Sequence, residues 1–334
     1  MNYENIKLTS SEIGTLWTQY VNGTMADCVN KYMYSIIEDE TIKKVFEDAI
    51  NTFARQKQEI TQLIQKDGFP VPAGFTDSDI NLEAPRLFTD IFCLYYLHIM
   101  TLHGLIGHMS SLSASTRKDM RQMYDSFDND GKVTFHQTIE LLLEKGKLLR
   151  DPLLYPEDNI QFVNDKSFAS GIFKPNRTLA ATEIVSLSYN IKKNIMAKSL
   201  SIAFAQVVQS EEARKFLEDS EKTADNQIKA LSKILQDDNL PSPVSYETEI
   251  TSSQISPFSD KLMMYHIGIL FQIGQIYHGA GLASSMRADL IIAYEAIILK
   301  TITVVKNWFD IMAKNKWLEQ PPLAPDRKEI IKNK

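Results

Sequence analysis

Apolar residues recur along the chain at helical spacing, and no run alternates between apolar and polar residues as a strand would. In the first half, Thr9 is followed three positions later by Glu12, a pattern typical of a helix start. The apolar spacing after Glu12 predicts a helix to about Ile36. A second helix is predicted from Ile42 to Gly68, where the glycine and two following prolines stop it. These patterns predict an all-α protein.

A segment without helical periodicity, residues 69–84, follows the second helix. It is too long for a tight turn, so we expect it to cross the length of a bundle. The third helix is predicted from Pro85, a favoured first-turn residue, to about Leu112, and the fourth from about Ser115 to Lys145. Two helices, a long crossover and two more helices are the ferritin-like form of a four-helix bundle.

The second half of the chain repeats the first. At an offset of 171 positions, residues 7–16 (KLTSSEIGTL) align with 178–187 (TLAATEIVSL). After one deletion the offset is 170, and residues 117–119 (RKD) align with 287–289 (RAD). Ordered matches over most of each half indicate an internal duplication. The repeat therefore predicts helices near 179–208, 211–237, 257–284 and 286–314.

The duplication also predicts the domain organisation. With 334 residues, the chain is long enough for two domains that each bury a core. We expect a first four-helix bundle over residues 1–156, a linker over 157–177, and a second bundle with a C-terminal tail over 178–334.

Composition excludes several partners. The net charge is −6 and the basic residues are scattered, so no basic face for nucleic acid is expected. The most apolar window, Leu262 to Ala283, contains His266 and His278, which favours a buried helix over a membrane span. Cys28 and Cys93 lie far apart, as core residues of a protein from a reducing compartment would. No leader is expected at the N-terminus, so the predicted location is cytoplasmic.

A di-iron centre is the sharpest chemical hypothesis for a ferritin-like bundle. It requires Glu-x-x-His on two helices, but Glu47 is followed by Ile50 and Glu218 by Glu221. His108 and His278 are the only histidines at repeated positions, and we expect them to be hydrogen-bonded within the bundles. The sequence thus predicts no metal and no cofactor. If a metal is bound, these two glutamates and two histidines are the weak candidates.

No catalytic motif is present either. The chain lacks a Gly-x-Ser-x-Gly elbow, a phosphate-binding glycine loop and a His-Glu-x-x-His pair. Residues 126–137 imitate the front of a calcium loop, but Gln137 stands where the loop needs a bidentate glutamate. The sequence therefore assigns no catalytic residue.

Several segments carry a resemblance to a known family: KLTSSEIGTLW, DGFPVPAGFTDSDINLEAPRLFTD, PFSDKLMMYH, ASSMRADL and KWLEQPP. They resemble the domain-of-unknown-function 3231 family of endospore-forming bacteria, over nearly the whole chain. The resemblance implies tandem ferritin-like bundles, and some members carry the label "putative spore coat protein". It implies no catalytic residues. A histidine expected near Gln56 to Gln58 in similar sequences is absent here, which further weakens a metal site.

Two classes of function follow. The first is a non-catalytic structural or interaction protein associated with sporulation or the spore coat, acting through protein partners or self-association. The alternative is a cytoplasmic helical-bundle enzyme or small-ligand-binding protein that uses the pocket between the bundles and has no classical di-iron centre. Neither class involves nucleic acid or a membrane.

Overall fold

The computed structural model describes residues 6–169 and 177–332. Within them, the regular structure is helical apart from two isolated β-bridges. The helices are α1 Ser10–Ile36, α2 Glu40–Lys66, α3 Asp90–Ser113, α4 Lys118–Glu144, α5 Ala181–Val207, α6 Glu211–Asp237, α7 Asp260–Ser284, α8 Ala288–Lys314 and the short α9 Arg327–Lys332. The predicted all-α fold with two tandem copies is confirmed.

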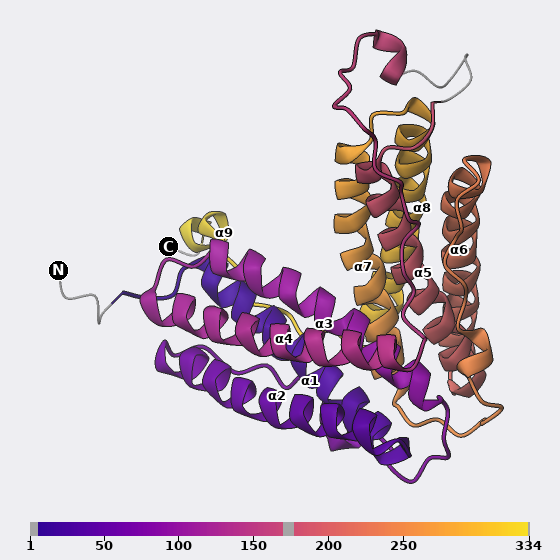
Figure 1. The fold of residues 1–334 in the computed structure, drawn as a ribbon. Helices are drawn as coiled ribbons and strands as arrows, with labels where there is room; N and C mark the ends of the chain where they lie inside the picture. The colour runs from indigo at the N-terminus through magenta and orange to yellow at the C-terminus, as the bar shows by residue number, and fades with distance from the viewer. Residues whose placement is uncertain (1–5, 170–176, 333–334) are drawn as a thin grey trace.

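Each copy packs two helical hairpins into a bundle, α1–α4 in the first and α5–α8 in the second, and the second bundle stands across one end of the first (Figure 1). The predicted linker lies between α4 and α5 in the chain, and residues 170–176 of it are outside the described part. The tail after α8 returns to the first bundle, where Glu319 accepts the backbone N–H groups of Ala73 (2.7 Å) and Gly74 (2.6 Å). The exact domain boundaries remain a prediction.

The third helix begins at Asp90 rather than at Pro85, so that part of the prediction is wrong. The preceding residues are extended because Phe88 forms an antiparallel β-bridge with Ile250 of the second copy. Thr89 then caps the helix through its side chain. A tertiary contact, and not the local preference of proline, sets where this helix starts.

The segments that connect α2 to α3 and α6 to α7 join the two copies through contacts that occur in pairs. Ile80 bridges Phe258 in the same way that Phe88 bridges Ile250. Ile80 and Ile250 are equivalent positions in the repeat, and so are Phe88 and Phe258. The two copies are therefore related by an approximate two-fold axis, as two subunits of a symmetric dimer would be.

The cap of each third helix is held by the opposite copy. Ser259, the N-cap of α7, donates its backbone N–H to the carbonyl oxygen of Asp79 (2.9 Å) and its hydroxyl to Asp79 Oδ1 (2.7 Å). Thr89, the N-cap of α3, donates in the same way to the carbonyl oxygen (3.0 Å) and Oε2 (2.5 Å) of Glu249. Each helix start therefore depends on the other copy.

Aromatic rings fill the space around the approximate axis. Tyr96 and His266, which are equivalent positions, meet across it, with the Tyr96 hydroxyl 3.4 Å from His266 Nε2. Two equivalent ring pairs flank this contact, Phe75 with Tyr265 at 5.1 Å and Tyr95 with Tyr246 at 4.3 Å between centroids. The junction is therefore continuous with the core of each bundle.

A buried carboxylate fastens the end of each bundle that lies away from this junction. Glu12 accepts the N–H of Thr9 (2.8 Å) before α1, and those of Thr116 (2.9 Å) and Arg117 (2.8 Å) before α4. Glu183 does the same in the second copy, with Ala180, Met286 and Arg287. Burial raises the pKa of Glu12, but the hydrogen-bond donors outweigh it and lower the pKa to about 2.

Replacing Glu12 by glutamine tests this clamp. We expect Glu12→Gln to lower the free energy of unfolding at pH 7 by about 1–3 kcal/mol, because charge-assisted hydrogen bonds are lost in a buried site. The folded-state pKa of about 2 lies below the ordinary value of 4.5, so the wild-type advantage is present above pH 4.5 and declines toward pH 2. Urea unfolding at several pH values measures it. Glu47→Gln, on an exposed face, is the control, and an equal loss in both variants would contradict the clamp.

Candidate functional site

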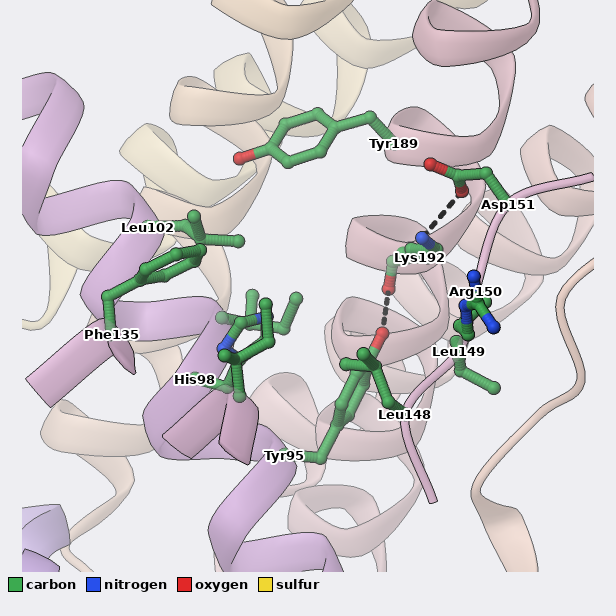
Figure 2. Close-up of a pocket in the computed structure, with 12 residues that line it drawn as sticks. Tyr95, His98, Leu102, Phe135, Leu148, Leu149, Arg150, Asp151, Tyr189 and Lys192 are labelled. Atoms are coloured by element: carbon green, nitrogen blue, oxygen red, sulfur yellow. Dashed lines mark hydrogen bonds and ion pairs between the residues drawn. The ribbon is translucent and has the colours of Figure 1, made fainter. Parts of the chain in front are cut away.

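A pocket of about 420 Å³ lies where the two copies meet (Figure 2). Its walls come from α3, α4 and the segment after α4 in the first copy, and from α5 in the second. The lining residues are Tyr95, His98, Ile99, Leu102, Phe135, Ile139, Leu148, Leu149, Arg150, Asp151, Tyr189 and Lys192. Because neither copy supplies all the walls, the duplication itself creates the pocket.

One end of the pocket is apolar and carries a histidine of defined tautomer. The ring of His98 stacks on Phe135, with centroids 5.3 Å apart, and its Nδ1 lies 3.1 Å from Thr138 Oγ1. Thr138 donates its own proton to the carbonyl oxygen of Phe135, so His98 Nδ1 must be the donor to Thr138. Burial, and next Lys192, lower the pKa of His98 to about 4. The ring is therefore neutral at pH 7, and Nε2 carries a lone pair.

The other end of the pocket is polar and cationic. Lys192 is tied to Asp151 by an ion pair of 2.6 Å, and Arg150 lies beside them (Figure 2). Tyr189 reaches across from α5, with its hydroxyl toward Leu102 and Phe135. This end therefore offers two cationic groups opposite an apolar wall, and the Tyr189 hydroxyl lies toward that wall.

Behind this pocket, the next residue of α5 is a buried lysine. Lys193 is 6% exposed, and no ion pair with it is found in the described part of the chain. Its Nζ lies 5.9 Å from the centroid of the Tyr277 ring, and burial lowers its pKa to about 7. His103 and His278 lie near it, and burial followed by the charge of Lys193 lowers their pKa values to about 3 and about 2. Burial thus favours the neutral amine over the ammonium ion.

Tyr277 separates the pocket from this lysine. Its ring contacts Tyr189 of the pocket at 4.8 Å on one side and His103 at 5.5 Å on the other, measured between centroids. A molecule in the pocket therefore lies two aromatic rings away from Lys193. Through these ring contacts, the wall of the pocket packs against the polar interior of the second bundle.

The two repeated histidines have equivalent surroundings but different partners. Each histidine packs over the glycine four residues earlier on its helix, His108 over Gly104 and His278 over Gly274. In both cases Cε1 lies 3.9 Å from the point where a Cβ on the glycine would stand. His108 Nε2 lies 3.1 Å from the amide nitrogen of Gln19, as a hydrogen-bonded interior histidine should. Neither ring nitrogen of His278 has a partner in the described chain, so that expectation is wrong for the second copy.

The shorter amide of Asn190, which replaces Gln19 in the repeat, explains this difference. Its nitrogen donates to the carbonyl oxygens of Ser186 (2.9 Å) and Tyr277 (3.2 Å), and so it is not directed to His278. Lys193 stands where the first copy has Asn22, which accepts from the hydroxyl of Tyr265 (2.8 Å). The two copies have therefore diverged from each other at the centres of their bundles.

The structure does not bring the four weak metal candidates together. Glu47 pairs with Lys44 at 2.8 Å on a half-exposed face of α2, and Glu218 is exposed on α6. His108 and His278 lie inside separate bundles. Among residues 6–169 and 177–332, no three His, Cys, Asp or Glu side chains form a group that could hold a metal.

One described helix, α3, has the length and apolar composition of a membrane span. Of its most apolar window, 56% is buried inside the protein, as in the core helix of a bundle.

The three histidines of α3 face different surroundings, as their spacing predicts. His98 lines the pocket, His103 is near Lys193, and His108 lies in the first bundle.

Sequence reasoning missed Tyr189, Arg150, Lys192 and Lys193. The sequence did contain an indication for Lys193. It lies on a predicted helix between apolar residues, Ile191 and Ile195, that belong to the core. The pocket residues carried no such signal, since they meet only when the two copies pack together.

The fold and the site define the class: an all-α protein with two tandem copies of a helical unit and a pocket at their junction. The family model described as "Protein of unknown function (DUF3231)" matches residues 1–160 and 167–330, and the chain belongs to this family. No curated protein matches. A solved structure of a "putative spore coat protein" from Bacillus halodurans C-125 is 20% identical, covers 46% of this chain and 100% of its own, and has a TM-score of 0.42. That similarity is too low to inform the site.

The absence of a metal remains a prediction that elemental analysis can test. We expect no stoichiometric iron, manganese or zinc after aerobic loading with Fe(II), because no three potential ligand side chains of the described residues come together at one point. About two iron atoms per chain, lost in Glu47→Gln or Glu218→Gln, would contradict it.

Proposed function

We propose that the protein binds a small molecule in the pocket between its two copies. The observation that carries this proposal is the composition of the pocket, which joins an apolar wall to a cationic end within about 420 Å³. Ligand sites of this size are commonly apolar with a few convergent polar groups. The lining groups are suited to binding and orienting a ligand, and we assign them no turnover.

The ligand class follows from the two ends of the pocket. Phe135 and Leu102 suit a flat apolar or aromatic body. Arg150 and Lys192 suit a carboxylate, which would compete with Asp151 for the lysine. The Tyr189 hydroxyl and the His98 Nε2 lone pair can then fix the orientation of a hydroxyl group. We therefore propose a small aromatic carboxylate as the ligand.

Binding of such acids can be measured by calorimetry with benzoate, 4-hydroxybenzoate and indole-3-acetate as probes. We expect at least one to bind, and Arg150→Gln or Lys192→Gln to weaken it about tenfold, the usual cost of losing a charge-assisted hydrogen bond. Arg55→Gln, which removes an exposed guanidinium in the first bundle, should leave affinity unchanged. Absence of binding by all three probes, or equal affinity in every variant, would contradict the proposal.

A second candidate concerns the setting of the protein in the cell. We propose a structural or interaction role in sporulation or the spore coat, with ferritin-like connectivity but no di-iron chemistry. Two observations support it: the paired caps that join the copies into one body, and the sequence resemblance to a family of endospore formers. The two proposals are compatible, since a coat or sporulation protein can also bind a ligand.

Fluorescent tagging in sporulating cells tests this second candidate. We expect the tagged chain to concentrate in the forespore or on the spore, and a deletion strain to form spores of altered resistance. Uniform signal in growing cells, absence from purified spores and normal spore resistance would together exclude a sporulation role, while leaving ligand binding untouched.

A further inference from the structure

An exposed apolar stripe runs along α8. Ile292, Leu299, Ile302 and Phe309 are between 51% and 68% exposed. They follow one another at intervals of seven, three and seven residues, which is the spacing of a coiled-coil seam. The buried residues of α8, among them Tyr294, lie on another face. The helix therefore has one apolar face for its own bundle and a second that faces solvent.

The fold of the bundle does not require this stripe. The equivalent positions of α4, at an offset of 170, are Gln122, Asn129, Lys132 and Ile139. Three of these four are polar and exposed, as on an ordinary outer helix face. Since α4 and α8 have the same place in their bundles, the apolar residues of α8 serve something that the first copy lacks.

Two charged residues complete the heptad positions of the stripe. Glu295 and Lys306 are exposed, and neither has an ion-pair partner within the described residues. They stand at equal distances from the midpoint of the stripe, which falls between Leu299 and Ile302. Reversing the direction of the helix therefore exchanges the negative position with the positive one.

This arrangement is complementary to itself in the antiparallel direction. When two copies of α8 run in opposite directions about that midpoint, the facing pairs are Ile292 with Phe309, Glu295 with Lys306, and Leu299 with Ile302. Each layer joins an a position to a d position, as in an antiparallel coiled coil. A parallel arrangement would set Glu295 against Glu295 and Lys306 against Lys306, and like charges disfavour it.

We propose that α8 is a homodimerisation surface, on which a second copy of this chain packs antiparallel across a two-fold axis. At 1.5 Å per residue, the seam from Ile292 to Phe309 is about 26 Å long, which is a modest interface. The dissociation constant should be micromolar rather than nanomolar, on the order of 1–100 μM. The surface is separate from the pocket, to which α8 contributes no residue.

Sedimentation of the full chain over a range of concentrations tests the dimer. The wild type should be in monomer–dimer equilibrium, and Leu299→Glu should raise the dissociation constant about 100-fold or more, because it places a charge in the apolar seam. Leu299 is largely exposed in the monomer, so the variant should fold normally. Val133→Glu, at an exposed apolar position of α4, is the matched control and should dimerise like the wild type.

Charge exchange tests the pairing. Glu295→Lys and Lys306→Glu should each weaken self-association about tenfold or more, whereas an equal mixture of the two variants should restore it. Glu218→Lys, the same change on α6, should have no effect. The antiparallel direction is tested by a zero-length carbodiimide cross-link. Glu295 and Lys306 of one chain lie about 16 Å apart along the helix, so a cross-link between these positions must join two chains.

Three results would overturn the proposal: a wild type that stays monomeric at millimolar concentration, a dimer whose affinity is unchanged by Leu299→Glu, or a dimer without the Glu295–Lys306 cross-link. Sedimentation with lipid vesicles distinguishes the other use of an apolar stripe. A monomer that binds vesicles through Leu299 would identify the stripe as a membrane contact and contradict the dimer.

Discussion

The structure depends on the reciprocal capping at the junction of the two copies. Thr89 caps α3 and Ser259 caps α7 from within their own copies, but each capping residue donates its N–H and its hydroxyl to the opposite copy, to Glu249 and Asp79 respectively. Each of these hydrogen bonds typically contributes about 1 kcal/mol, and the ring pairs around the approximate axis add buried apolar surface. The duplicated chain is thus an intramolecular version of a symmetric dimer, and its pocket is a consequence of that junction.

Much of the fold could be predicted because its determinants are local and occur twice. The box formed by Thr9 and Glu12 marks the start of α1, and the structure shows it as a capping box. The start of α3 could not be predicted, because Pro85 lies in a segment that the second copy holds extended. The reach of Glu12 to α4 was also invisible, since a cap pattern reports only its own helix.

The candidate site was beyond sequence reasoning for a related reason. His98 and Lys192 are far apart in the chain and approach only through the angle between the bundles. The divergence of the second copy was visible as a lysine and an asparagine in place of Asn22 and Gln19, but its meaning depends on burial. A buried amine without an acid partner costs folding free energy, and Asn22 at the equivalent position of the first copy avoids this cost. The two copies therefore differ in the buried polar groups at the centres of their bundles.

We expect the junction to make the two copies one cooperative unit. Hydrogen exchange in increasing urea, followed by mass spectrometry, measures this most directly, because it reports the opening of each helix separately. The core amides of α1–α4 and of α5–α8 should lose protection at one common urea concentration, and Ser259→Ala should lower that concentration equally for both copies. If one copy opened at lower urea while the other stayed protected, the copies would be independent domains that the junction does not couple.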